Sequence, residues 1–428
     1  MSVVLIAAAK CPYYDCNADL SEGASTCSKC RRRVAACPQC GVANRAYASF
    51  CLACGEDLHP VIQWGTACAD AAGTGYSDVS FTFPPAGRQL SVIWSRKFDL
   101  EPGFAQPLLA GLGHVFLVAR DGLHVLGDAG GDERVLLKPG GAIVGAAVTG
   151  RSLVIAVKDR VMHYNLVDML DGRSAAPEWS CAVSGATVET GPVVIGIEDL
   201  FFVARRPAGA CVCRVAIGKR KMAGEFPVAP TRPGTSRLLF RHPFVVHVGE
   251  RAIVGLNVET GQRWEVKDPL PGGQAVIVHA AISSAGLFTL DSGGQLCYTA
   301  LGSVDKIVRE RFKFKPWGMA VSPEAIVVTD DEGASRVFDY SGFRFAEHGN
   351  LTSLGPYAFT TPVAVCRNAY VAGTNSGHLV GWETERMGRS IQVLCPDRVR
   401  ISAAPVFFAD GMLFCNSDGL VGAVGVRS

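Results

Sequence analysis

The chain has 428 residues, of which 48% are hydrophobic and 19% are charged, and its formal net charge is +2 at pH 7. This length suits a small module followed by one large domain with a sizeable core. Because the charges nearly cancel, we expect no strong attraction of the whole chain to nucleic acid or to anionic lipid. No apolar run reaches the roughly 18 residues that a membrane-spanning helix needs.

Eight cysteines lie within the first 54 residues and form four short pairs. Ten residues separate the first pair from the second, and ten separate the third from the fourth. Structural zinc is bound tetrahedrally and favours thiolates from two such pairs joined by a longer arm. The spacing therefore predicts two structural Zn²⁺ ions, one for each consecutive group of four cysteines. The predicted ligands are Cys11, Cys16, Cys27 and Cys30 for the first ion, and Cys37, Cys40, Cys51 and Cys54 for the second.

Disulfides or a redox-active pair are the alternative roles for these cysteines. A redox Cys-x-x-Cys motif is expected where a helix begins in a βαβ unit, and no such pattern surrounds the four pairs. Catalytic zinc keeps one coordination position open, whereas four cysteines fill every position of each predicted site. We therefore expect structural sites without a catalytic residue.

The second group of cysteines carries a family resemblance. Glycine directly follows the second thiolate in Cys37-Pro38-Gln39-Cys40-Gly41 and in Phe50-Cys51-Leu52-Ala53-Cys54-Gly55, and the segment ends with Glu56-Asp57-Leu58. This half resembles the double zinc ribbon family, over roughly residues 10–58. The first group departs from the pattern, because four residues separate Cys11 from Cys16 and Asn17 replaces the glycine. The resemblance implies a tandem zinc ribbon over residues 1–58.

The basic run Arg31–Arg33 raises nucleic-acid binding as an alternative function of this module. Residues 1–60 hold six Lys or Arg and five Asp or Glu. Eight thiolates on two Zn²⁺ ions bring the charge of the folded module to about −3, because each tetrathiolate site is doubly negative. Binding to phosphates needs a basic face. We therefore expect a solvated turn at Arg31–Arg33 and do not expect nucleic acid as the partner.

The other cysteines and the first residues bear on the compartment. Eight further cysteines, from Cys68 to Cys415, show no disulfide framework, and free thiols in such number are typical of a reducing cytoplasm. The apolar segment Val3–Ala9 lacks a basic leading region and is short for a secretory core, which favours an edge strand or ordered leader over a signal. The sequence thus predicts a cytoplasmic protein. Residues 59–90 contain Gly- and Pro-rich runs without apolar periodicity and are predicted to form a flexible linker.

Residues 91–428 form a repeat. Short apolar runs alternate with Gly, Asp, Asn and Ser turns, which is typical of many short antiparallel strands. The starting prolines Pro107, Pro192, Pro362 and Pro405 are separated by multiples of about 42 or 43 residues. The second strands of the units are expected at His114–Ala119, Leu153–Val157, Leu200–Ala204, Phe244–Val248, Leu287–Leu290, Ala325–Thr329, Ala369–Gly373 and Met412–Cys415. A four-stranded unit of about 40 to 45 residues, repeated radially, is a β-propeller blade.

The sequence therefore predicts a mainly β chain, in which the tandem zinc ribbon is joined to an eight-bladed propeller, with seven blades as the alternative. The last unit stops after its third strand, so its outer strand is missing. Residues 91–96, which precede the first unit, have no other place in the repeat. We expect them to pair with the third strand of the last blade and so to close the ring.

A second resemblance concerns the type of propeller. The segment Asn257-Val258-Glu259-Thr260-Gly261-Gln262-Arg263-Trp264 resembles the end of a repeat from the PQQ-enzyme-like propellers, with WD-type repeats as the runner-up. Quinone-binding enzymes of this kind need a planar cofactor, a calcium ion and commonly two adjacent cysteines. This chain has no adjacent cysteines, and Cys211 and Cys213 are expected to be two buried free thiols on one face of a strand.

These observations together predict a zinc-binding, non-enzymatic interaction or scaffold protein, with two structural Zn²⁺ ions and other proteins as partners. The first alternative is a nucleic-acid-binding protein that uses the zinc ribbons. The second is a propeller enzyme with a quinone-like cofactor, that is, a PQQ-type oxidoreductase.

Overall fold

A computed structural model gives the arrangement of the chain. The residues that it describes are 9–12, 16, 18–21, 24, 27–30, 34–37, 39–45, 51, 53–54, 62–64, 76–77, 81, 83, 89–100, 107–127, 130–195, 199–229, 236–241, 243–266, 275–283, 286–301, 307–312, 314–322, 325–330, 334–341, 344–351, 358–384, 390–408 and 411–426.

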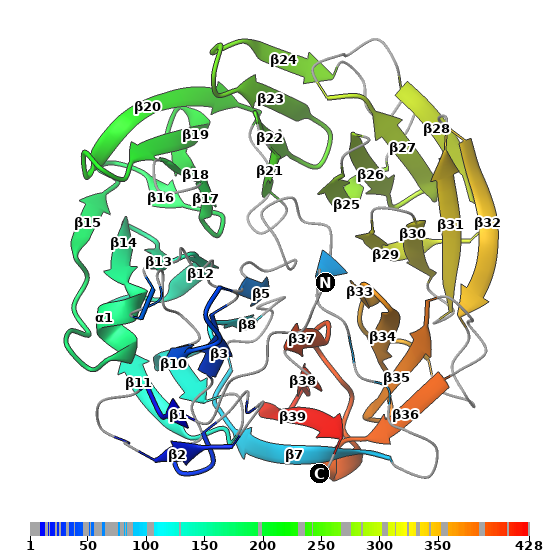
Figure 1. Ribbon diagram of the computed structural model, residues 1–428. Helices are drawn as coiled ribbons and strands as arrows, with labels where there is room; N and C mark the ends of the chain where they lie inside the picture. Colours follow the sequence, from blue (N-terminus) through cyan, green and yellow to red (C-terminus); the bar gives the residue numbers. More distant parts are fainter. Residues whose placement is uncertain are drawn as a thin grey trace.

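Eight antiparallel sheets stand side by side in a closed ring, which is the predicted eight-bladed β-propeller (Figure 1). The first four blades consist of β8 (Leu108–Gly111), β9 (His114–Ala119), β10 (Gly122–Gly127) and β11 (Glu133–Leu137); β12 (Ile143–Thr149), β13 (Ser152–Val157), β14 (Arg160–Asn165) and β15 (Trp179–Ala182); β17 (Val193–Ile195), β18 (Asp199–Arg206), β19 (Gly209–Ala216) and β20 (Lys221–Val228), with β16 (Thr187–Val188) also on β18; and β21 (Arg237–Arg241), β22 (Phe244–Val248), β23 (Ile253–Asn257) and β24 (Arg263–Val266).

The last four blades follow the same order from the centre outward. They consist of β25 (Ile277–Ile282), β26 (Leu287–Asp291), β27 (Gln295–Thr299) and β28 (Ile307–Arg311); β29 (Pro316–Val321), β30 (Ala325–Asp330), β31 (Ser335–Ser341) and β32 (Arg344–Leu351); β33 (Ala364–Cys366), β34 (Ala369–Gly373), β35 (His378–Glu383) and β36 (Ser390–Leu394); and β37 (Val406–Phe408), β38 (Gly411–Cys415), β39 (Leu420–Val426) and β7 (Leu90–Lys97).

The second strand of every blade is apolar and buried because both of its faces pack against neighbouring blades. In β9 and in β38, for example, every residue is buried. Strands buried on both faces read as continuous apolar runs rather than as alternating patterns. For this reason all eight predicted second strands coincide with strands of the structure, and the prediction of eight blades is confirmed.

The ring closes between the two ends of the repeat, as the sequence predicts. Strand β7 comes from residues that precede the first blade, yet it pairs antiparallel with β39 at the end of the chain, with Ser95 opposite Gly422. The outer strand of the eighth blade is therefore supplied by the N-terminal side. This arrangement joins the ends of the propeller by hydrogen bonds and leaves the eighth blade with four strands.

The segment predicted as a linker contributes two short strands to the propeller. Strand β5 (Ile62–Trp64) pairs antiparallel with the inner strand β8 of blade 1, and β6 (Tyr76–Ser77) pairs parallel with the inner strand β33 of blade 7. Phe81 is 2% exposed, and its backbone exchanges two hydrogen bonds with the Asn368 side chain, of 2.7 and 2.8 Å. These described parts of residues 59–90 are therefore fixed to the propeller, in contrast to the predicted flexibility.

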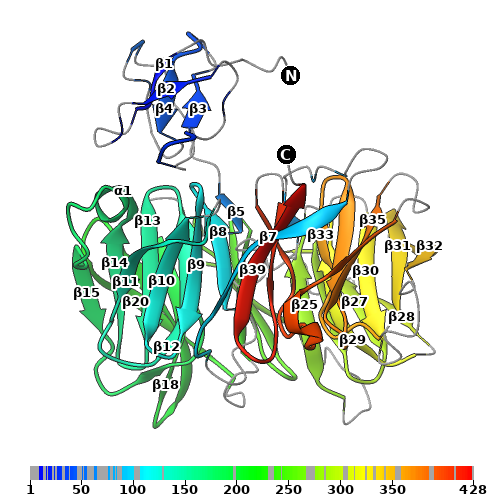
Figure 2. The ribbon, with the colours of Figure 1, turned by 90° about the horizontal axis from the view of Figure 1, so that it is seen from below.

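A small module with four short strands lies over one face of the ring, above blades 1 and 2 (Figure 2). Strand β1 (Ala9–Lys10) pairs with β2 (Asp19–Leu20), and β3 (Val34–Ala36) pairs with β4 (Ala43–Arg45). The α-helix α1 (Leu166–Leu170) follows β14 on the same side, and Asn165 caps it by accepting hydrogen bonds from the N–H groups of Val167 and Asp168. Within the described ranges, the helices lack the length and the apolar composition of a membrane span.

Candidate metal centres

The first four predicted ligands meet at one point of the N-terminal module. The Sγ atoms of Cys11, Cys16, Cys27 and Cys30 all lie within 4.8 Å of one another, with 3.8 Å between Cys11 and Cys30 and 3.5 Å between Cys16 and Cys27. Thiolates bound to one tetrahedral zinc ion at about 2.3 Å lie about 3.8 Å apart. The four sulfurs therefore stand at the spacing that a single tetrahedral ion requires.

The last four predicted ligands form a second group of the same kind. The Sγ atoms of Cys37 and Cys54 are 3.5 Å apart and those of Cys40 and Cys51 are 3.6 Å apart. All four lie within 4.8 Å of one another. Cys37 and Cys51 are buried, whereas Cys40 and Cys54 are exposed. This group could hold an ion at the surface of the module, while the first group lies largely inside it.

The local fold of the second group follows from its turn chemistry. Gly41 has a φ of 71°, and its N–H donates to the carbonyl of Cys37 over 2.9 Å. Such a left-handed turn favours glycine, which has no Cβ to collide with the backbone. The turn reverses the direction of the chain between Cys40 and β4. Gly55, the glycine that follows Cys54 in the sequence, lies outside the described residues.

Hydrogen-bond donors around the sulfurs favour the thiolate form that a metal needs. Burial raises the pKa of Cys51, but the Asn44 amide at 3.4 Å and the N–H groups of Cys54 and Ala53 lower it to about 6. Burial also raises the pKa of Cys27, which the N–H groups of Cys30 and Lys29 bring to about 7. Hydrogen-bond donors aimed at a ligand sulfur orient it and stabilise its charge when a metal is bound. The Asn44 side chain and the backbone N–H groups thus favour deprotonation of one thiol in each group.

With four cysteines in each group, the protein atoms fill a tetrahedral coordination sphere. Such sites hold a fold together and leave no position for a substrate. Both groups could each hold a zinc ion, and the donor set fits a structural role. The sequence located every one of these residues because the ligands are close in the chain and their spacing is short.

The N-terminal module is docked on the propeller through the first cysteine group. Cys11, Cys16 and Cys27 share one buried apolar cluster with Leu166 and Met169 of α1. Arg45 Nη1 lies 2.7 Å from Asp171 Oδ2, in a pair whose side chains are 20% and 2% exposed. Arg134 of blade 1 donates to the carbonyl of Cys30 over 3.4 Å. The sequence contains no local signal for this contact, because its two sides are more than 100 residues apart.

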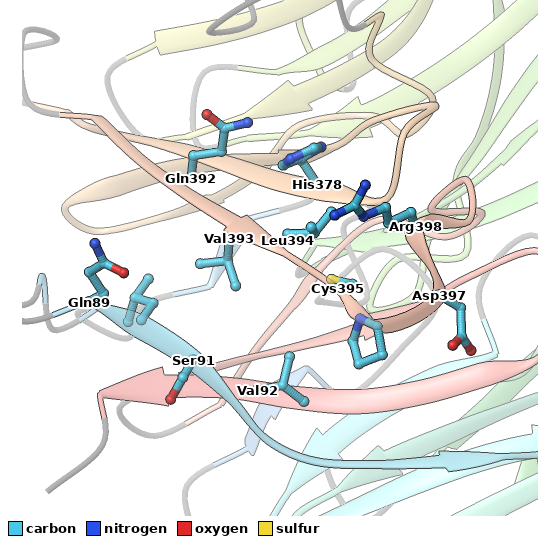
Figure 3. A pocket seen from close by; sticks show the side chains of 12 residues that line it. Gln89, Ser91, Val92, His378, Gln392, Val393, Leu394, Cys395, Asp397 and Arg398 are labelled. Atoms are coloured by element: carbon cyan, nitrogen blue, oxygen red, sulfur yellow. The ribbon is translucent and has the colours of Figure 1, made fainter.

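A groove lies on the rim of the ring between β36 and β7, the outer strands of blades 7 and 8. It has a volume of about 700 Å³, and Gln89, Ser91, Gln392, His378, Asp397 and Arg398 supply its polar lining (Figure 3). Asp397 and Arg398 have φ angles of 68° and 53°, which cost free energy in residues other than glycine. Leu394 also lines the groove and is 40% exposed. The groove therefore combines an exposed apolar side chain with groups of both charges and amide groups.

Comparison with known proteins identifies the propeller by its shape and not by its sequence. No protein-family model matches the chain, and no curated protein matches it. Among solved structures, a quinohemoprotein alcohol dehydrogenase from Comamonas testosteroni has a TM-score of 0.62 and 11% identity, with 85% of this chain and 80% of that chain covered. BamB from Moraxella catarrhalis gives a TM-score of 0.57 and 14% identity, covering 78% of this chain and 99% of that chain. The computationally designed Ika8 protein gives 0.58 and 15%, covering 79% and 99%. At these identities the likeness shows the propeller fold alone.

Proposed function

We propose that this chain is a zinc-binding, non-enzymatic interaction protein in which a tandem zinc ribbon and the propeller together form one recognition platform. The observation that carries this proposal is the pair of four-cysteine groups, whose sulfurs are spaced for two closed tetrahedral sites. In the proposal, zinc gives the ribbon its fold, because a module of this size has too small a core to fold without metal. The cytoplasm is the proposed compartment, since the fifteen described cysteines form no disulfide with one another.

Exposed apolar side chains indicate where a protein partner would bind. Among the described residues, Val42, Ile93 and Leu394 are large hydrophobic side chains that are about 40% exposed. Val42 follows the exposed Cys40 by two residues. Leu394 of β36 lines the rim groove, and Ile93 lies on β7 next to Val92, which also lines it. Protein partners select exposed apolar side chains rimmed by polar groups. Both surfaces therefore suit another protein better than a phosphate backbone.

Metal analysis of the full-length protein tests the zinc assignment. We expect the double variants Cys27→Ala/Cys30→Ala and Cys51→Ala/Cys54→Ala each to lose one zinc per chain relative to the wild type. Unchanged zinc content in both variants would remove the basis of the proposal. Loss in one variant alone would limit it to that group.

Binding of a partner protein tests the recognition role. Leu394→Asp or Val42→Asp should weaken capture of the partner, while Lys219→Glu, an exposed change on blade 3, should leave it intact. If the full-length protein instead binds RNA or DNA with steep salt dependence, the ribbons serve nucleic acid and the proposal is wrong.

A quinone-dependent oxidoreductase is the second candidate, because dehydrogenases of that type share the fold. One observation opposes it. Strand β5, which lies near the centre of the ring (Figure 1), pairs with the inner strand of blade 1, and β6 pairs with the inner strand of blade 7. Quinone-binding enzymes need their planar cofactor in this central channel. A coloured cofactor or stoichiometric calcium in the purified protein would support the enzyme candidate.

A further inference from the structure

Three metal-binding side chains gather on one face of blade 3, away from the N-terminal module. Cys211 and Cys213 are two residues apart on β19, so their side chains lie on the same face. Glu225 of β20 stands directly opposite Cys213 in the antiparallel register. Cys211 and Cys213 are 7% and 0% exposed, and they face the outer strand of blade 2 in a shared apolar cluster.

The distances within this cluster match the edges of a metal coordination sphere. The two Sγ atoms are 3.7 Å apart, and Cys211 Sγ lies 3.9 Å from Glu225 Oε2. On a tetrahedral zinc ion two thiolates lie about 3.8 Å apart, and a thiolate and a carboxylate oxygen about 3.6 Å apart. The sulfur spacing equals that of the four-cysteine groups in the ribbon module, which is 3.5–3.8 Å.

Arg206 fixes the carboxylate of this cluster. Its Nη2 donates to Glu225 Oε1 over 2.5 Å, and its Nη1 donates to the carbonyl of Ser184 over 3.0 Å. The second carboxylate oxygen, Oε2, is thereby turned toward Cys211. Metal-binding carboxylates are commonly held by such an outer hydrogen bond. Two thiolates and one carboxylate would be neutralised by a divalent ion together with the guanidinium.

We propose that Cys211, Cys213 and Glu225 form a third metal site, which takes a thiophilic divalent cation of the zinc class and leaves a fourth coordination position open. The site differs from the two closed sites of the ribbon because the described residues supply three protein ligands to it. The ion reaches it from the side of Glu225, whose side chain is 33% exposed. A surface hollow of about 640 Å³ is lined in part by Arg206, the residue that holds the Glu225 carboxylate.

The test compares zinc content among variants of the full-length chain, with the ribbon cysteines left intact. Cys211→Ala/Cys213→Ala should contain one zinc per chain less than the wild type after loading with Zn²⁺ and gel filtration. Cys181→Ala is the matched control, since Cys181 packs against the same apolar cluster outside the three ligands. It should keep the wild-type content. Equal zinc content in the wild type and in Cys211→Ala/Cys213→Ala would overturn the proposal.

Two further variants decide the question if the double variant does not fold. Glu225→Gln removes the carboxylate charge and Arg206→Ala removes its hydrogen bond, both at partly exposed positions. Each should weaken the affinity of one zinc by about tenfold or more in competition with a chromophoric chelator. Unchanged affinity in both variants would contradict the site. A disulfide between Cys211 and Cys213, seen as a mass lower by two hydrogens in protein purified under reducing conditions, would also contradict it.

Discussion

Glycine and tryptophan pack against each other where the sequence resembles a PQQ-type repeat. Trp264 of β24 is 9% exposed and lies on Gly255 of β23, so close that a Cβ atom on Gly255 would stand 2.0 Å from Trp264 Cε2. The motif that ends in Trp264 is therefore a packing motif of the blade. It carries the fold without specifying a cofactor.

This contact predicts how a single methyl group added at Gly255 changes the stability of the fold. Gly255→Ala should lower the free energy of unfolding by about 1–3 kcal/mol, because the added carbon forces the indole ring away from the sheet. Gly218→Ala is the matched control, since a Cβ there meets no atom within 4 Å. Urea denaturation followed by tryptophan fluorescence measures both. Equal urea midpoints for the two variants would show that the packing of the Trp264 indole does not require glycine at position 255.

A buried histidine in blade 4 makes the stability of the propeller depend on pH. His247 is 0% exposed, its Nε2 lies 2.7 Å from Ser236 Oγ, and burial lowers its pKa from 6.5 to about 4. The unfolded chain binds a proton at this residue below pH 6.5, whereas the folded chain does so only near pH 4. The stability that the neutral residue contributes is thus complete above pH 6.5 and is lost as the pH falls toward 4.

His247→Met should flatten this pH profile. The wild type is expected to lose about 3 kcal/mol between pH 6.5 and pH 4 through this residue, and the variant should not. The measurement is the urea midpoint at several pH values, in chelated protein so that zinc release does not contribute. Parallel profiles for the two proteins would contradict the assignment.

At the scale of elements, ring closure depends on a strand that is remote in sequence. Trp94 of β7 is 8% exposed and covers Gly131 of blade 1, where a Cβ would stand 2.5 Å from the indole. The strand thus contributes packing to the neighbouring blade as well as hydrogen bonds to β39.

Trp94→Ala should therefore open the ring. The expected loss is about 3–5 kcal/mol of unfolding free energy, the usual range for removing a buried aromatic side chain. Ile93→Ala is the control on the same strand, because Ile93 is 43% exposed and should change stability by about 0.5 kcal/mol or less. Thermal melting compares them, and similar melting temperatures would show that β7 does not hold the ring.

The elements divide into those that the sequence could predict and those that it could not. The eight second strands were predictable because each is a short apolar run at a constant spacing. Strands β5 and β6 were not, since residues 62–64 and 76–77 form strands only by pairing with β8 and β33. The cysteine groups were readable because their ligands are local in the chain. Glu225 was not, because only the strand register brings it opposite Cys213.

At the scale of the whole molecule, the N-terminal module and the propeller form one packed unit. The linker composition predicts two independent parts, yet the Arg45–Asp171 pair and the cluster around α1 join them. Long-range contacts of this kind have no signature in a single sequence. The first cysteine group therefore supports the contact with the propeller, whereas two cysteines of the second group, Cys40 and Cys54, are exposed.

The most direct test of this account is hydrogen–deuterium exchange of the full-length protein with zinc bound and after chelation. If zinc holds the fold of the N-terminal module, chelation should speed exchange in strands β1 to β4. Exchange should also become faster in α1 and β11, because the module that covers them is lost. Blades 4 to 6 should stay unchanged. Unchanged exchange in the ribbon strands would show that metal does not hold the module, and the account would fail.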